Sequence, residues 1–133
     1  PRIVVAASTP HAGDNGLMGR EELDVIAPAV QAMQARHVEV TGPLPADTLW
    51  LKVRSGEYDA VVTMYHDQGQ IAIKLLGFDQ GVSVLAGLPI PITTPAHGTA
   101  FDIAGQNKAN LAPTRNAFDM AVDMAAQRLQ GQS

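Results

Sequence analysis

Two short apolar runs constrain the fold of this chain more than any other feature. Residues 2–7 and residues 60–64 each place small and β-branched side chains in succession, without the polar alternation of a half-exposed strand. Such continuous runs are typical of strands buried on both faces of a parallel sheet. Helical patterns at 20–36 and 114–130 alternate with strand-like runs, which predicts an α/β fold with a largely parallel sheet flanked by helices.

Shorter elements fill the rest of the chain, and residues 60–64 are expected to form a central strand of the sheet. The Gly-Pro-Leu-Pro sequence predicts a rigid loop, and three prolines between residues 88 and 95 predict an extended segment or an edge. The full set of these elements is a glycine-rich loop at 8–19, a strand at 38–40, the rigid loop at 42–45, helices at 46–53 and 71–75, a strand at 82–86 and the extended segment at 88–95.

The two long helices carry different signals. The helix at 20–36 has Glu21 and Glu22 in its first turn, where the helix dipole favours acids, and Pro28 predicts a kink or a later start. The helix at 114–130 is followed by Gly131. Apolar residues at helical spacing predict the buried faces: Leu23, Ile26, Ala27, Val30 and Met33 in the first helix, and Phe118, Ala121, Val122, Ala125 and Leu129 in the second.

Composition narrows the possible functions. With 133 residues, a single α/β unit over residues 1–133 is expected. A net charge of −4 and the lack of a basic run argue against a nucleic-acid partner. No apolar stretch reaches transmembrane length and no signal peptide is recognisable, so no membrane partner is expected. The absence of Cys excludes a disulfide scaffold and a thiolate metal site, and fits a cytoplasmic protein.

Two histidines follow the two apolar runs. His11 lies in Pro-His-Ala-Gly and His66 lies in Tyr-His-Asp-Gln-Gly. A single histidine in such a turn is more often structural than a ligand. Because the carboxyl ends of parallel strands meet at one edge of a sheet, however, the pair predicts a shared site for Zn²⁺ or another divalent metal such as Mg²⁺, Mn²⁺ or Co²⁺. Two ligands are too few, so a third must come from elsewhere.

Other polar residues have both a structural and a functional interpretation. Asp47 fits an N-cap or a first-turn acid as well as a catalytic group. His37 ends a helix and is expected at the surface. Lys74, in an apolar run, either extends its ammonium group to solvent or binds an acidic substrate and handles a proton.

The segment from His97 to Asn110 predicts a nucleotide-binding loop. Gly98 and Gly105 allow a ligand to approach the backbone closely, and Asp102 is placed to bond a ribose or the adenine side of a cofactor. The segment lacks the G-x-G-x-x-G fingerprint, so a Rossmann phosphate loop is not supported.

These motifs resemble a known family. The segments PHAGDNGLMGREELDVIAP, GPLPADTLW, YHDQGQIAIKLLGF, GVSVLAGLP and HGTAFDIAG are similar to the C-terminal part of 4-hydroxythreonine-4-phosphate dehydrogenase and its close relatives. HGTAFDIAG, with Ala109 and Asn110, is also similar to the nucleotide-binding loop of the isocitrate and isopropylmalate dehydrogenases. The resemblance therefore implies an isocitrate/isopropylmalate dehydrogenase-like fold, of which this chain is the C-terminal part of a two-domain subunit.

The resemblance also implies a chemistry. It implies oxidation of a hydroxyl group with NAD or NADP, coupled to decarboxylation of the resulting β-keto acid. It implies a homodimer whose active site is shared across the interface, a small hydroxy-acid substrate and a role in pyridoxine biosynthesis. The family's third metal histidine belongs to the preceding half of its chain. This chain, which begins at Pro1 without an initiator Met, is therefore expected to be inactive alone.

Site residues carry over by position. His11 and His66 match two of the family's metal ligands, and Lys74 matches its substrate lysine. Ser83 stands at a substrate asparagine, and Ile92 stands at an arginine in a gapless reading. Asp47 and Asp67 are expected to act with Lys74, orienting ligands or substrate. The expected cofactor residues are His97, Gly98, Thr99, Ala100, Phe101, Asp102 and Asn110.

Two alternatives stay open at this point. Isoleucine cannot make the paired hydrogen bonds that arginine makes to phosphate, so Ser83 and Ile92 favour an unphosphorylated cyclic diol. The family member with that activity is terephthalate cis-dihydrodiol dehydrogenase, an enzyme of aromatic catabolism. The second alternative is a non-catalytic nucleotide-binding fragment, and the retention of His11 and His66 speaks against it.

Overall fold

A computed structural model describes residues 1–77 and 79–131. The chain forms two compact units, and the boundary between Ala72 and Ile73 falls inside helix α3 (His66–Gly77). The prediction of a single α/β unit over residues 1–133 is not tested by this division and stays a prediction. None of the helices in the described ranges is both long enough and apolar enough to cross a membrane.

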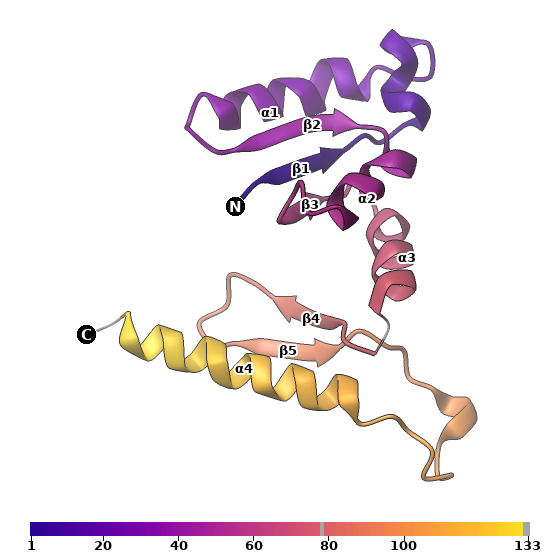
Figure 1. Cartoon of the computed structure of the whole chain (residues 1–133), viewed down its shortest axis with the longest axis vertical. Helices are drawn as coiled ribbons and strands as arrows, with labels where there is room; N and C mark the ends of the chain where they lie inside the picture. Colours follow the sequence, from indigo (N-terminus) through magenta and orange to yellow (C-terminus); the bar gives the residue numbers. More distant parts are fainter. Residues whose placement is uncertain (78, 132–133) are drawn as a thin grey trace. The chain divides into compact units, whose positions relative to one another are not determined.

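The first unit is built on a parallel sheet. Its three strands run in the order β2 (Val40–Leu44), β1 (Ile3–Ala6) and β3 (Ala60–Val62), and β1 pairs in parallel with both neighbours (Figure 1). The predicted parallel α/β arrangement is confirmed here. The expectation that residues 60–64 form the central strand was wrong, because β1 takes the central position of this sheet.

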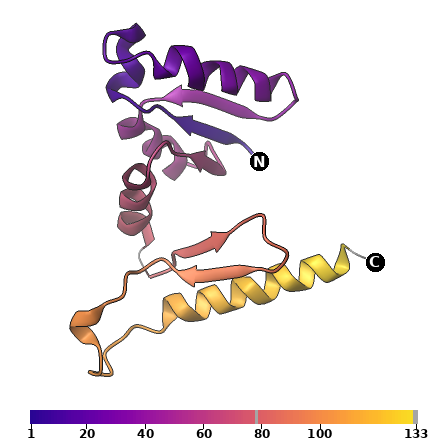
Figure 2. The same ribbon diagram turned by 180° about the vertical axis from the view of Figure 1, so that it is seen from behind.

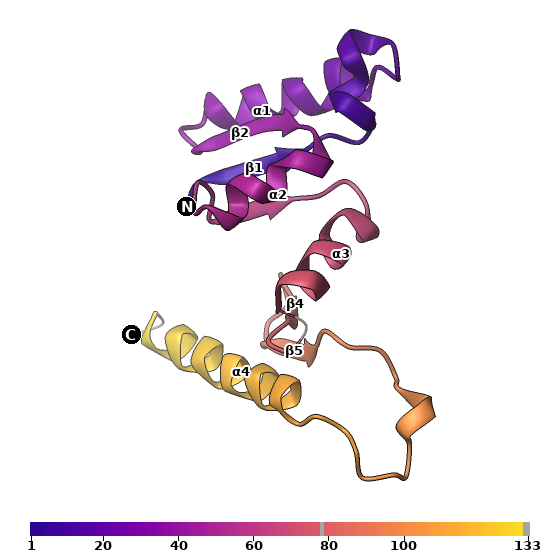
Figure 3. The ribbon, with the colours of Figure 1, turned by 45° about the vertical axis from the view of Figure 1, so that its right-hand side comes forward.

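Alternate residues of β1 are buried on opposite faces of the sheet. Val5 packs with Ile26, Val30 and Val40 on the side of α1 (Ala27–Gln34). Val4 and Ala6 pack with Leu49 on the side of α2 (Ala46–Arg54). Figure 3 shows the two helices on different sides of the sheet. Because both faces of β1 are buried, apolar side chains are needed at successive positions, and this explains the continuous apolar sequence of residues 3–6.

The helix predicted at 20–36 begins with a wider turn. A π-helical segment, η2 (Glu22–Ile26), continues directly into α1, and Pro28 lies in the first turn of α1. The later start that Pro28 predicted is therefore confirmed for the α-helical part. Proline has no N–H to donate, so it is tolerated in a first turn.

The strand predicted at 38–40 and the loop predicted at 42–45 were both misplaced. The structure instead places β2 at Val40–Leu44, so Gly42 and Pro43 belong to a strand. A Cβ on Gly42, whose φ is +140°, would lie 2.6 Å from the carbonyl oxygen of Val5. The glycine thus allows β2 to approach β1 closely, and the register between the strands shifts between Val4 and Ala6.

The second unit is a hairpin covered by a helix. Strands β4 (Val82–Leu85) and β5 (Ile92–Pro95) are antiparallel, and α4 (Ala112–Gln130) packs on them (Figure 2). Thr93 Oγ1 donates a 2.7 Å hydrogen bond to the carbonyl oxygen of Ala117 in α4. The strand predicted at 82–86 and the helix predicted at 114–130 are confirmed within a few residues.

The predicted buried face of α4 is confirmed in part. Ala121 and Ala125 are half-buried and follow the buried Pro113 and Ala117 at helical spacing. The larger apolar side chains were misplaced, because Phe118 is 67% exposed and Leu129 is 71% exposed. Helical periodicity alone could not tell which apolar residues of the helix would be buried.

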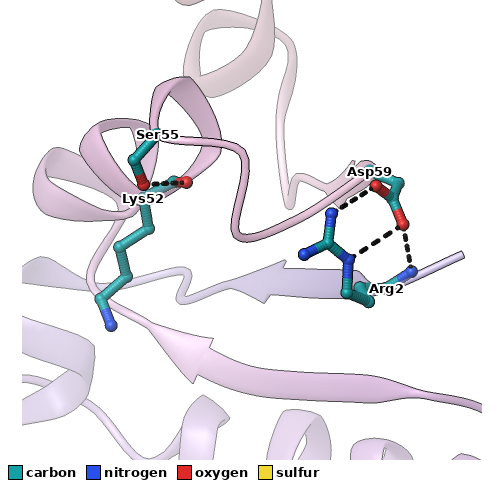
Figure 4. A network of polar contacts seen from close by, with 4 residues as sticks. All are labelled: Arg2, Lys52, Ser55 and Asp59. Atoms are coloured by element: carbon teal, nitrogen blue, oxygen red, sulfur yellow. Dashed lines mark hydrogen bonds and ion pairs between the residues drawn. The ribbon is translucent and has the colours of Figure 1, made fainter.

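An ion pair joins β1 to the segment before β3 at their amino ends. The guanidinium of Arg2 donates to Asp59 at 2.7 Å, and the backbone N–H of Arg2 donates to the same carboxylate at 2.7 Å (Figure 4). Nearby, Ser55 Oγ donates to the carbonyl oxygen of Lys52 at 2.8 Å near the end of α2. The hydrogen bonds from Arg2 lower the pKa of Asp59 from 3.8 to about 2.

We expect Asp59→Asn to lower the melting temperature at pH 7 and to reduce the fall of the melting temperature between pH 4 and pH 2. The pKa of Asp59 is lower in the folded chain, so its contribution is present above about pH 4 and is lost as the pH falls towards 2. Melting temperatures at pH 7, 4, 3 and 2 test this. Asp24→Asn is the control, because Asp24 forms an exposed i,i+4 pair with Arg20. Equal acid sensitivity of wild type and Asp59→Asn would contradict the prediction.

Candidate functional site

A pocket of about 270 Å³ opens beyond the carboxyl end of β1, in the first unit. It joins segments that are far apart in the sequence, and we call it the His11 pocket. Its lining residues are Ser8, Thr9, Pro10 and His11 after β1, Ala46 and Asp47 at the start of α2, and Tyr65 and Gln68 around the start of α3. The structure therefore places His11 and Asp47 around one pocket. The argument from parallel strands concerned His11 and His66, and that pairing stays a prediction.

His11 lies in a left-handed turn. The segment η1 (Pro10–Gly16), predicted as a plain loop, contains five successive residues with φ between 42° and 80°, from His11 to Asn15. Left-handed backbone costs about 1–2 kcal/mol for each residue that carries a Cβ. Strain of this kind persists only where the surroundings hold it, and it gathers at functional sites.

Glu22 holds the start of this turn. Its carboxylate is 3% exposed, and it accepts hydrogen bonds from the backbone N–H of Ser8 at 2.7 Å, the backbone N–H of Thr9 at 2.8 Å and Thr9 Oγ1 at 2.8 Å. Burial raises the pKa of Glu22, but these hydrogen bonds outweigh burial and leave its pKa below the ordinary value. Glu22 is therefore a buried, ionised carboxylate. The prediction that it merely complements the helix dipole was incomplete.

Gln68 holds the other side of the pocket. Its Nε2 donates to the carbonyl oxygen of Ala7 at 2.6 Å, and its Oε1 accepts from the backbone N–H of Met64 at 2.8 Å. One side chain of α3 thus links the chain after β1 to the chain after β3. This link fixes the distance between the two strand ends from which the predicted metal ligands follow.

His66 lies at the first residue of α3, where the sequence predicted a turn. Its Nδ1 lies 2.8 Å from Asp67 Oδ1. A carboxylate that accepts a hydrogen bond from Nδ1 orients the ring, and this is the arrangement typical of histidines that bind a metal through Nε2. His66 does not line the His11 pocket, but its neighbour Tyr65 does.

Asp47 lies in the first turn of α2 and is exposed. The N-cap position belongs to Pro45, and Asp47 makes no capping hydrogen bond. The N-cap interpretation of Asp47 was therefore wrong, but the alternative of a first-turn acid is confirmed. Asp47 also lines the His11 pocket, and its functional role stays a prediction.

The donor set fits a divalent metal in part. Imidazole and carboxylate groups suit Zn²⁺ and similar ions, and the first unit supplies His11, His66, Asp47 and Asp67 on three segments that end near the same sheet edge. Across residues 1–77 and 79–131, no group of three or more His, Cys, Asp or Glu is close enough to hold a metal. The expectation that a third ligand comes from elsewhere stays a prediction.

The predicted nucleotide loop is open in the second unit. It contains a short helix, η3 (Phe101–Ile103), and left-handed residues at Ala100 and Gly105. A Cβ on Gly98 would meet no atom within 4 Å, and Phe101 is 81% exposed. The loop therefore leaves room for a ligand at the backbone of Gly98.

Asn110 has a structural role in this loop. Its Nδ2 donates to Asp79 Oδ1 at 3.1 Å, and its Oδ1 accepts from the backbone N–H of Ala112 at 3.0 Å. Both ends of the amide thus anchor the loop where α4 begins. The role of Asn110 in cofactor binding stays a prediction.

The substrate positions lie on one face of the hairpin. Ser83 lies opposite Thr94 and Leu85 lies opposite Ile92, so these four side chains share a face. Thr93, on the other face, bonds α4. Lys74 is exposed on α3. The structure therefore groups Ser83 and Ile92 on the hairpin face away from α4.

Two residues hold the strand ends in a way that the sequence did not predict. Glu22 was predicted only as a first-turn acid, and Gln68 was not singled out; they lie near the starts of η2 and α3. An acid and an amide at such places are common at any helix start. Their bonding to the strand ends required the tertiary structure.

Comparisons with known proteins match this chain to one protein family. The family model of the pyridoxal phosphate biosynthetic protein PdxA matches residues 1–121. A Pseudomonas aeruginosa protein named "Putative 4-hydroxythreonine-4-phosphate dehydrogenase 2" is 63% identical over 126 residues, which cover 93% of this chain and 37% of that protein. D-threonate 4-phosphate dehydrogenase of Pectobacterium atrosepticum is 50% identical, over 94% of this chain and 38% of that protein. The chain thus spans little more than a third of the length of these relatives.

Solved structures agree with these matches. The crystal structure of 4-hydroxythreonine-4-phosphate dehydrogenase from Klebsiella pneumoniae superposes with a TM-score of 0.78 at 55% identity, over 91% of this chain and 37% of that chain. The terephthalate 1,2-cis-dihydrodiol dehydrogenase from Burkholderia xenovorans superposes with a TM-score of 0.57 at 31% identity, over 90% of this chain and 38% of that chain.

We expect Gln68→Leu to destabilise the first unit by about 1–3 kcal/mol, because the carbonyl of Ala7 and the N–H of Met64 both lose a partner. Gln70→Leu, on the same helix without these contacts, should have a much smaller effect. Urea unfolding of both variants measures the difference. Equal unfolding midpoints for the two variants would show that Gln68 does not link the strand ends.

Proposed function

The chain belongs to the family of the pyridoxal phosphate biosynthetic protein PdxA, and on this premise we propose that it forms the C-terminal part of a metal- and NAD(P)-dependent dehydrogenase. The relatives that it matches are named dehydrogenases of 4-hydroxythreonine-4-phosphate or of D-threonate 4-phosphate. The proposed substrate is accordingly a small phosphorylated hydroxy acid. The observation that carries the proposal is the His11 pocket, which places an imidazole and a carboxylate together at the edge of a parallel sheet.

The proposed metal ligands in this chain are His11 and His66. Asp67 holds the ring of His66 through Nδ1, and Asp47 is placed beside His11 to orient a ligand or substrate. A bound divalent metal lowers the pKa of a substrate hydroxyl and polarises a carbonyl. The third ligand is proposed to come from the part of the relatives that this chain does not span.

The proposed cofactor is NAD or NADP, bound at residues 97–110. The open backbone at Gly98 and the exposed ring of Phe101 offer surface for the adenosine end of the cofactor. Asp102 is proposed to accept a hydrogen bond from a ribose hydroxyl. Asn110 contributes by holding the loop to the start of α4.

The reaction is proposed to proceed in two stages. A nicotinamide cofactor held at residues 97–110 would supply the hydride acceptor for the carbon atom that carries the substrate hydroxyl, and with release of the hydroxyl proton the substrate would become a β-keto acid. The β-keto acid then loses CO₂, and the enolate that remains takes up a proton at carbon. Lys74 is proposed to bind an acidic group of the substrate or to handle this proton. Asp47 orients the reacting end of the substrate.

The rest of the proposed enzyme rests on the family resemblance, and its second domain also on the relatives' greater length. We propose a homodimer of two-domain subunits whose active site is shared across the interface, in the cytoplasm. The chain alone is proposed to lack turnover, since it supplies two metal ligands and only part of the substrate contacts.

We expect His11→Asn and His66→Asn to abolish turnover in the complete enzyme and to weaken metal binding by more than about 100-fold. Asparagine suits the left-handed backbone of His11, so the loss reports on the imidazole. His37→Asn is a matched control, since His37 is also left-handed, with φ at 62°. Isothermal titration with Zn²⁺ and a coupled NAD(P)H assay measure both effects. Unchanged metal affinity in His66→Asn would refute the metal site. A wild-type complete enzyme that binds NAD(P) but has no turnover would favour the non-catalytic alternative.

A second candidate substrate is an unphosphorylated cyclic diol. It is favoured by Ile92, which puts an apolar side chain on the same hairpin face as Ser83. The similarity to the terephthalate dihydrodiol dehydrogenase, at 31% identity, is weaker than the similarity to the phosphate-specific relatives.

We expect Ile92→Arg to raise kcat/KM for 4-hydroxythreonine-4-phosphate by about 10-fold or more, because a guanidinium bonds phosphate through two N–H groups. It should lower kcat/KM for a cyclic diol. Assays of wild type and variant with both substrates give the comparison. Leu85→Arg, across the hairpin from Ile92, controls for the added charge. No gain with the phosphorylated substrate would show that phosphate is held elsewhere.

A further inference from the structure

We propose that Glu22 is a positioning residue for the metal site, because it fixes the left-handed turn that presents His11. The inference rests on the proposed function, in which His11 is a metal ligand. It adds a residue that touches neither metal nor substrate. Three features of the first unit support it: the bonding of the carboxylate, the stiffness of the chain between Thr9 and His11, and the space beneath Gly13.

The carboxylate binds the chain just before the turn. Glu22 Oε1 accepts from the backbone N–H groups of Ser8 and Thr9, and Oε2 accepts from the hydroxyl of Thr9. The preceding residue, Ala7, is held on both sides, since its N–H donates to Leu44 and its carbonyl accepts from Gln68. The backbone from Ala7 to Thr9 is therefore tied to β2, α3 and η2 at once.

The backbone from Thr9 to His11 links the position of the bonded segment to the position of the His11 side chain. Thr9 is extended, with φ at −109° and ψ at 160°, and Pro10 has its φ fixed by its ring. His11 then enters the left-handed region with φ at 54°. Few backbone torsions are left free between the bonds to Glu22 and the imidazole, so the carboxylate sets where His11 lies.

Glu22 also lies beneath the middle of the turn. A Cβ on Gly13 would come within 2.8 Å of Glu22 Oε2, and Gly13 is buried with φ at +80°. The carboxylate thus bonds the chain just before the turn, at Ser8 and Thr9, and lies so close to Gly13 that no side chain fits there. Each residue with a Cβ in a left-handed run adds a conformational free-energy cost, so a run of this length needs stabilising contacts from its surroundings.

The test is metal binding in folded variants of the complete enzyme. With Co²⁺ as the probe, we expect Glu22→Ala to raise the dissociation constant for Co²⁺ by about 100-fold and to change the visible Co²⁺ spectrum. We expect Glu22→Gln, which keeps an acceptor for both N–H groups, to raise this constant by about 10-fold. Glu21→Ala and Glu21→Gln are matched controls on the adjacent, exposed glutamate and should bind as the wild type does.

The outcomes separate three possibilities. Weaker Co²⁺ binding and an altered spectrum, measured well below each variant's melting temperature, would support positioning. A lower melting temperature with wild-type affinity and spectrum would overturn it and leave Glu22 only a stabilising residue. If Glu22→Ala does not fold, Glu22→Gln decides by the same criteria. A wild-type enzyme that binds no Co²⁺ would instead overturn the proposed metal function itself, and this inference with it.

Discussion

The burial of β1 on both faces is the constraint on which the first unit depends. Val4 and Ala6 pack towards α2, and Val5 packs towards α1, so a single short strand supplies the centre of two apolar clusters. Its hydrogen bonds go to β2 on one side and to β3 on the other. Once β1 is fixed in this way, the residue that follows its last paired residue has little conformational freedom. The chain must therefore leave the sheet at a defined point. The His11 pocket begins at that point.

Beyond the strand end, polar contacts replace apolar packing as the source of order. A buried carboxylate and a side-chain amide together satisfy backbone groups of four residues that no strand or helix would otherwise satisfy. Buried polar groups are costly when unpaired, so such contacts specify one conformation of the loop and penalise the others. The core therefore sets where the site lies, and Glu22 and Gln68 set its detailed geometry.

Much of the fold could be predicted from the sequence, because its signals are local. The strand at 3–6 and the helices at 46–54 and 112–130 follow from apolar runs, periodicity and turn residues. The argument from the edge of a parallel sheet was made for His11 and His66; His11 lines the pocket at that edge, His66 does not, and their shared metal site stays a prediction. The features that could not be predicted depend on contacts between segments that are distant in the sequence. Gly42 is typical of a loop, and only its contact with β1 shows why a strand needs glycine there. Glu22 is typical of a first-turn acid, and only the three hydrogen bonds that it accepts show its further role.

The left-handed run from His11 to Asn15 changes how variation in this segment should be interpreted. In an ordinary loop, an alanine scan reports the chemistry that each side chain loses. Here, at His11, Asp14 and Asn15, the same scan also places alanine at backbone angles that it tolerates less well than asparagine or glycine does. Two contributions are thus mixed in one measurement, and Asp14→Ala would lower stability even if the carboxylate of Asp14 made no contact. Paired substitutions to glycine and to alanine separate the two contributions, because only the alanine variant carries the conformational penalty.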